Sequence, residues 1–278
     1  MNEGSYIRPA AVAGMFYPEQ PGDLRQTVDG LLAMSRPSAQ RGRLLGLVVP
    51  HAGYSYSGVT AAHAFSFLKG REKLTAVVIG PSHREYFDGI SVFPGKAFAT
   101  PLGVVQVDET FRNDLLEHMP SLRSSLEGHR TEHSVEVQIP FLQCAVAKLR
   151  IVPIVIGHQT RDYCESLGAA LAATLGTEDA VLVASSDLSH YYDSETAEKL
   201  DAIAIESIRS MDYGKLMTDI DEERTEACGG GPVVSVLYAA KALGSDMCAI
   251  LHACNSGATS GDTDRVVGYV SAALWKTH

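Results

Sequence analysis

The sequence predicts an α/β fold in which helices cover both faces of a largely parallel sheet, and two observations carry that prediction. Short apolar, β-branched segments alternate along the 278 residues with longer segments that have helical spacing. The apolar segments lack strict polar alternation, which is typical of strands buried on both faces of a parallel sheet. We therefore expect a three-layer α/β/α sandwich with a mostly parallel, mixed central sheet.

Six segments are expected to form strands because they are short, apolar and bounded by Gly, Pro or polar turn residues. They span residues 44–49, 76–80, 151–156, 180–184, 248–253 and 266–273. Helices are expected from the spacing of apolar residues over 23–34, 58–68, 109–118, 134–148, 161–175, 194–210 and 233–243. An edge hairpin is expected near residues 90–107. Since no internal repeat or low-complexity tract divides these elements, we expect residues 1–278 to form a single domain.

The composition excludes several classes of partner. A formal charge of -10 without a cluster of Lys and Arg argues against a nucleic-acid-binding surface. No apolar run reaches the roughly 20 residues needed to cross a bilayer, and the first residues lack the apolar core of a signal peptide. The five cysteines are widely spaced and form no CxxC pair, which is typical of a reducing compartment. We expect a cytoplasmic protein that binds neither nucleic acid nor a membrane.

Chemically reactive residues follow several of the expected strands. His51 comes just after the first strand and His83 after the second, while Asp187 and His190 follow the fourth. Cys228 precedes three glycines and a proline, a turn that is expected to lead into the last helix. Because ligands of open α/β sheets bind at the carboxyl ends of the strands, we expect these five side chains to share one polar site.

The types of side chain in this group favour a metal ion. A thiol near a helix N-terminus has a lowered pKa, so we expect Cys228 to be a thiolate. His51, His83 and this thiolate would suit zinc, iron or copper rather than magnesium or calcium, and would leave open positions for a substrate or O₂. Taken singly, a histidine after a strand or a buried cysteine is more often structural than functional. It is their coincidence that favours a shared site.

The segment TEHSVEVQIPFL, residues 131–142, adds a second polar cluster. Thr131 is expected to cap a helix on which His133 and Glu136, three residues apart, share a face. Two interpretations remain open, because Glu132 and Glu136 could simply favour a helix start, or His133 could line the same pocket as the other histidines. The residues expected to line the pocket or support the ligands are Glu132, His133, Tyr54 and Ser82.

The signatures of several common enzyme classes are missing from the sequence. The run GYSYSG has no Gly two residues to each side of either serine, so it is not a GxSxG nucleophile elbow. There is no GxxxxGK[ST], no HExxH, and no GxGxxG after a strand. A serine hydrolase, a P-loop NTPase, a zinc protease and a nicotinamide dehydrogenase are therefore all disfavoured.

Several long motifs resemble one known family. RPAAVAGMFYP, PHAGYSYSG, GPSH, EHSVEVQIPFL, SSDLSHY, CGGGP and VVGYVSAAL run from Arg8 to the last strand. On these motifs the chain is similar to the Memo-like proteins, whose bacterial and archaeal members include AmmeMemoRadiSam system protein B. The resemblance extends over essentially the whole chain.

This resemblance implies a fold and a set of site residues. The family resembles the class III extradiol dioxygenases, whose α/β/α sandwich holds a non-haem iron at the strand ends. On that basis His51, His83 and Cys228 correspond to the metal ligands, with Fe(II) the expected cofactor and Cu or Zn the alternatives. Asp187 and His190 correspond to pocket residues, and His190 occupies the position of the dioxygenase acid/base histidine.

One departure changes the expected chemistry. Extradiol dioxygenases complete the iron site with a carboxylate, whereas this chain offers Cys228, which donates more electron density and is itself oxidisable. Ordinary catechol cleavage is therefore not expected to carry over.

Three hypotheses follow from the sequence. The first is a metal-dependent oxidoreductase in which His190, oriented by Asp187, moves protons for a small substrate. The second is a binding module that holds a peptide or small-molecule ligand without turnover. The third is a hydrolase with Cys228 as nucleophile and His190 or His133 as base.

Overall fold

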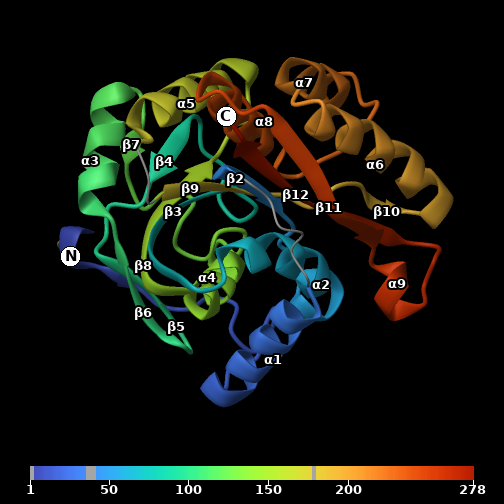
Figure 1. The fold of residues 1–278 in the computed structure, drawn as a ribbon, viewed down its shortest axis with the longest axis horizontal. Helices are drawn as coiled ribbons and strands as arrows, with labels where there is room; N and C mark the ends of the chain where they lie inside the picture. Colours follow the sequence, from blue (N-terminus) through green and yellow to red (C-terminus); the bar gives the residue numbers. More distant parts are fainter. Residues whose placement is uncertain (1–2, 36–41, 177–179) are drawn as a thin grey trace.

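The computed structural model describes residues 3–35, 42–176 and 180–278 (Figure 1). The strands are β1 (Ile7–Arg8), β2 (Arg43–Val49), β3 (Arg71–Pro81), β4 (Ile90–Val92), β5 (Ala97–Thr100), β6 (Gly103–Val107), β7 (Arg123–Ser124), β8 (Val146–Ile156), β9 (Ala180–Ser185), β10 (His190–Tyr192), β11 (Met247–Asn255) and β12 (Val266–Lys276). The α-helices are α1 (Pro21–Met34), α2 (Tyr54–Phe65), α3 (Glu109–His118), α4 (Ile139–Ala145), α5 (Arg161–Thr174), α6 (Ser194–Arg209), α7 (Tyr213–Asp221), α8 (Gly230–Ala242) and α9 (Gly257–Ser260). Short 3-10 helices cover Glu3–Ser5, Ser66–Leu68 and Glu136–Gln138.

The strands of the described residues form one mixed sheet. Their order is β1-β5-β6-β8-β3-β9-β2-β12-β10, with β11 paired to β12 and β4 paired to both β7 and β8. The central strands β8, β3, β9 and β2 are parallel to one another, whereas β12 pairs antiparallel with β2, β10 and β11. The expected edge hairpin is formed by the antiparallel pair β5 and β6.

Strand β3 shows why the central strands lack polar alternation. Leu74, Ala76 and Val78 belong to the apolar core on one face of the sheet. Val77 and Ile79 belong to the core on the opposite face. Successive side chains of a strand point to opposite faces, so a strand covered on both sides must be apolar at every position.

Helices form a layer on each face of this sheet (Figure 1). Apolar side chains of α1, α2 and α4 pack in one core, and those of α3, α5, α6, α7 and α8 pack in the other. The α/β class and the three-layer arrangement predicted from the sequence are confirmed. No helix among the residues that the structure describes is long and apolar enough to cross a membrane.

The order of the central strands determines where the polar site lies. Strands β3, β9 and β2 are adjacent and parallel, and their registers align Ile79 with Ala184 and Val49 with Ser185. The loops that leave these three strands therefore start at the same edge of the sheet. That edge is the position at which ligands of open α/β sheets bind.

The predicted helix over residues 134–148 is wrong in its bounds. The chain forms the 3-10 turn at 136–138 and then α4, and it becomes strand β8 at Val146. Thr131 caps no helix, and His133 precedes the 3-10 turn, so His133 and Glu136 do not share a helix face. Glu136 instead points to the buried Arg8. Helix α7, which the sequence did not predict, occupies 213–221.

Candidate metal centre

The loops after β2 and β3 place His51 and His83 next to Cys228. One potential metal-ligating atom from each of these three residues lies within 4.8 Å of the others. The imidazole rings of His51 and His83 are 5.0 Å apart between centroids, and His51 Nε2 is 3.1 Å from Cys228 Sγ. The structure therefore brings together the two histidines and the cysteine that the sequence singled out.

Cys228 is held at the rim by the segment that follows β9. Its backbone N–H donates to the Asp187 carbonyl at 3.2 Å, and the Asp187 N–H points to Cys228 Sγ at 3.3 Å. The next residue, Gly229, approaches so closely that a Cβ there would lie 2.2 Å from the Ser185 carbonyl oxygen. Only glycine permits this approach, which explains why glycine must follow the cysteine.

The hydrogen bonds around Ser185 determine the tautomer of His51. Ser185 Oγ has one hydrogen, which it donates to the Ser134 carbonyl at 2.7 Å, and it accepts a hydrogen bond from Gln138 Nε2 at 2.9 Å. Its remaining bond joins His51 Nδ1 at 2.9 Å, so the imidazole must be the donor there. Nδ1 of His51 then carries the hydrogen, and its Nε2 lone pair faces Cys228 Sγ.

Glu132 orients His83 in the same way. Its Oε1 atom is 2.9 Å from His83 Nδ1, and its Oε2 atom accepts the His83 backbone N–H at 2.6 Å. Burial would raise the pKa of Glu132, but hydrogen bonds from His133 and His83 outweigh burial and hold that pKa well below its ordinary value. An ionised carboxylate can only accept hydrogen bonds, so Nδ1 of His83 carries a hydrogen and Nε2 is the nitrogen left to serve as a ligand. A carboxylate behind a ligating histidine is the usual second layer of a metal site.

His133 lies beside these rings, 4.7 Å from His83 and 5.4 Å from His51 between ring centroids. His83, Glu132 and His133 form a second group whose ligating atoms are close enough for a metal ion. Glu132 Oε1, however, already accepts hydrogen bonds from the backbone N–H groups of His133 and Ser134 as well as from His83. A metal ion there would have to displace these bonds, so we assign Glu132 a supporting role.

Burial is the main influence on the charge states of His51 and Cys228. Burial, with the nearby His83 and His133, lowers the pKa of His51 well below its usual range, so this ring is neutral. Burial also raises the pKa of the Cys228 thiol, and Asp187 raises it further. Desolvation therefore opposes the thiolate state that the helix N-terminus is expected to favour. Metal binding would have to displace the thiol proton.

Asp187 does not orient His190 as the sequence suggested. Asp187 Oδ1 accepts the backbone N–H of His51 at 2.7 Å, and burial raises the pKa of this carboxyl to about 7, although hydrogen bonds from the backbone of His51 and Ala52 lower it in part. His190 makes its hydrogen bond with the backbone of Leu188 instead. Asp187 thus fixes the loop that carries a candidate ligand.

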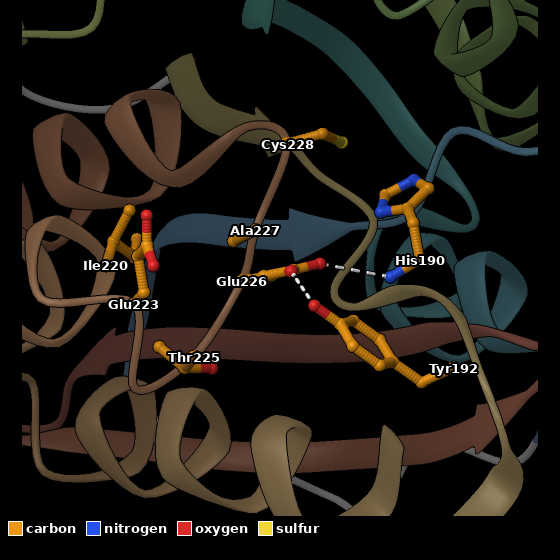
Figure 2. A pocket seen from close by; sticks show the side chains of 8 residues that line it. All are labelled: His190, Tyr192, Ile220, Glu223, Thr225, Glu226, Ala227 and Cys228. Carbon is orange, nitrogen blue, oxygen red and sulfur yellow. Dashed lines mark hydrogen bonds between the residues drawn. The ribbon is translucent and has the colours of Figure 1, made fainter. Parts of the chain in front are cut away.

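His190 faces a pocket of about 570 Å³ that extends outward from Cys228. Burial lowers the pKa of His190, so the ring is neutral near pH 7. Figure 2 shows its backbone N–H bonded to Glu226, whose other carboxylate oxygen accepts the Tyr192 hydroxyl. Glu226 was not predicted, although it lies only two residues before Cys228.

Tyr54 and Ser82 lie near the site but support it indirectly. The Tyr54 ring packs against Tyr17 and Phe141 in the core, and its hydroxyl donates to the Val137 carbonyl at 2.6 Å. The Ser82 hydroxyl donates to the Glu85 carbonyl. Neither side chain is hydrogen-bonded to a candidate ligand in the described residues.

A buried ion pair that the sequence did not reveal anchors the supporting loop. Arg8 and Glu136 are fully buried and paired. Arg8 also donates to the backbone carbonyls of His129 and Glu132. The N-terminal segment therefore fixes the loop whose Glu132 orients His83.

The donor set fits a borderline transition metal. Two imidazoles and one cysteine sulfur converge, and in both imidazoles Nδ1 is hydrogen-bonded, which leaves Nε2 as the ligand atom. Nitrogen and sulfur donors bind Zn, Fe and Cu, whereas Mg and Ca require oxygen donors.

Comparisons with known proteins place the chain in a family. Its residues 8–273 match the family described as Memo-like protein. A MEMO1 family protein of Sulfurisphaera tokodaii is 37% identical over 279 residues, covering 95% of this chain and 98% of that protein. A MEMO1 family protein of Methanobrevibacter smithii is 36% identical over 277 residues, with the same coverage. The crystal structure of an uncharacterized Escherichia coli K12 protein matches with a TM-score of 0.49 and 17% identity, over 84% of this chain and all of that one. On its family match and these relatives, the chain belongs to the Memo-like protein family.

Proposed function

We propose that His51, His83 and Cys228 bind a metal ion, Fe(II), and that the adjoining pocket supports a metal-dependent oxidation of a small molecule. The observation that carries this proposal is the direction of the lone pairs. Hydrogen bonds to Ser185 and Glu132 occupy Nδ1 of the two imidazoles, so each ring offers Nε2 as a ligand. Three protein ligands would leave coordination positions open.

The protein's own groups would assist such chemistry in distinct ways. Bound iron would supply redox chemistry and Lewis acidity. His190 is neutral and lines the pocket, so its imidazole can accept a proton from a bound substrate. Asp187 holds the His51 backbone, and Glu132 and Ser185 hold the two imidazole rings.

Metal analysis tests the proposal directly. Protein purified without chelator should contain about one equivalent of iron per chain, and Cys228→Ala should lose it, because a thiolate ligand is removed. Cys254→Ala is the matched control, since Cys254 is also partly buried and, among the described residues, its sulfur is hydrogen-bonded to Thr60 rather than to a candidate ligand. Equal iron content in wild type and Cys228→Ala would contradict the proposal. Absence of stoichiometric iron, copper or zinc from the wild type would favour a metal-free binding module.

The contact of 3.1 Å between Cys228 Sγ and His51 Nε2 supports a second candidate, a cysteine-dependent hydrolase. The base would then be His51 rather than His190 or His133. The raised pKa of the Cys228 thiol opposes this alternative, since a nucleophilic cysteine needs thiolate character. Hydrolysis by metal-free protein that alkylation of Cys228 abolishes would favour it over the metal proposal.

A further inference from the structure

The pocket that extends from Cys228 has an acidic wall without a cation. Cys228 and His190 line it, and Glu223 and Glu226 are its charged lining residues. Figure 2 shows the Glu226 carboxylate projecting between His190 and Tyr192. The donors that reach this carboxylate within the described chain, the Tyr192 hydroxyl and the His190 backbone N–H, are both neutral.

The cationic side chains nearest to this wall in sequence are already engaged. Arg224 pairs with Asp219 and with Glu222. Lys215 also pairs with Asp219. Neither cation is among the residues that line the pocket. Within the described part of the chain, neither glutamate of the wall forms an ion pair with a cationic side chain.

Other groups around the pocket increase the negative potential or leave it unchanged. Asp201, whose carboxylate accepts the Ser189 N–H, interacts electrostatically with Glu226. His190 is neutral near pH 7 and adds no positive charge. With a formal charge of -10 on the whole chain, long-range electrostatics also favour a cation over an anion.

We propose that this pocket binds a small molecule that carries an ammonium or similar organic cation. The cationic group would contact Glu226, and Glu223 would add negative charge to the same pocket lining. The adjoining atoms of the molecule would face Cys228 and His190. As an assignment of substrate class, this inference rests on the proposed function of the metal centre. Recognition of the cation itself needs only the carboxylates and can be measured without metal.

Three probes of similar shape and different charge test the inference. Phenethylamine, 2-phenylethanol and phenylacetate are titrated into metal-free full-length protein, and binding is followed by saturation-transfer NMR. Phenethylamine should bind about tenfold more tightly than phenylacetate or better, with 2-phenylethanol between them, because a partly desolvated carboxylate attracts the cation and repels the anion.

Glu226→Gln is the informative variant. Its amide oxygen can accept from the His190 backbone N–H, and its NH2 group can donate to the Tyr192 hydroxyl oxygen, so the loop should keep its conformation. The preference for phenethylamine should fall severalfold. Glu117→Gln on α3 removes the same charge from an exposed site outside the pocket and should leave the preference unchanged. Thermal unfolding of both variants verifies that they fold.

Each result has a definite meaning. Absence of phenethylamine binding, equal affinity for the three probes, or a preference that Glu226→Gln leaves intact would overturn the inference. Iron is measured on the same wild-type preparation before chelation. Selective amine binding by protein that never held a metal would support the cation pocket while contradicting the metal proposal, so the two failures are distinguishable.

Discussion

At the scale of single residues, the site depends on side chains that would not themselves contact a metal ion. Ser185 donates to the Ser134 carbonyl and accepts from Gln138, which leaves only an acceptor role toward His51. This arrangement fixes the tautomer of His51 before any metal binds. A ring that is already oriented loses less freedom on binding, so such supporting residues contribute to metal affinity.

Replacing Ser185 by Ala should weaken metal binding without removing a ligand. His51 would lose its acceptor at Nδ1, and its Nε2 would no longer be held as the free nitrogen. We expect iron affinity, measured by competition with a chelator, to fall by roughly 10- to 100-fold. Nitrogen-15 NMR of the His51 imidazole in metal-free protein should show the Nδ1–H tautomer in wild type and a mixture in the variant.

The control for that experiment is Ser235→Ala, which removes another fully buried serine hydroxyl from α8. Iron affinity should not change in this variant. An Nε2–H tautomer of His51 in wild type, or unchanged affinity in Ser185→Ala, would refute the role assigned to Ser185.

The sequence identified the candidate ligands but could not identify their supports. His51, His83 and Cys228 stand out together, because two imidazoles and a thiol occur at positions that a parallel sheet brings to the same edge. Ser185 and Gln138 are ordinary at the end of a strand and in a helical turn. Their roles depend on contacts between residues 47 positions apart in the chain, which no local pattern records.

At the scale of elements, the N-terminal segment acts as a clamp on the loop between β7 and α4. Arg8 donates to the carbonyls of His129 and Glu132 and pairs with Glu136. Glu136 in turn accepts the backbone N–H groups of Ala11 and Val12. Both charges are buried and fully hydrogen-bonded, which is the condition under which such a pair is tolerated.

Arg8→Met should destabilise the protein by about 3–5 kcal/mol, because it leaves the buried Glu136 carboxylate without its cation. The double variant Arg8→Met with Glu136→Leu should recover part of this loss. Urea unfolding followed by circular dichroism provides the measurement.

Arg209→Met serves as the comparison, since Arg209 forms an exposed i,i+3 pair with Glu206 on α6. This change should cost less than about 1 kcal/mol. Equal destabilisation by Arg8→Met and Arg209→Met would show that the clamp contributes nothing beyond an ordinary surface pair.

The elements were predictable to different degrees. Strand β3 and helix α6 have strong apolar patterns, so their existence was predicted correctly. The segment 134–148 was misassigned because an apolar run with helical spacing continues directly into strand β8. The residues before α4 are held by Arg8 and by hydrogen bonds to the chain at the ends of β2 and β3. These tertiary contacts override the local helical preference.

At the scale of the whole molecule, the order of the central strands creates the site. The neighbouring strands β3, β9 and β2 end at one edge of the sheet. Cys228 lies just before α8 and is held at that edge by its hydrogen bond to the segment that follows β9. The sequence predicted this shared edge from the general behaviour of parallel sheets. It could not predict that burial would raise the pKa of the Cys228 thiol, or that Glu226 would give the adjoining pocket an acidic wall, because both depend on packing.

X-ray absorption at the iron edge tests the central claim most directly. Iron-loaded wild-type protein should show one sulfur and two imidazole groups in its coordination shell, and the sulfur should be absent from iron-loaded Cys228→Ala. Such a result would establish His51, His83 and Cys228 as a ligand set. An iron shell that contains only nitrogen and oxygen, and that is the same in wild type and Cys228→Ala, would contradict the account.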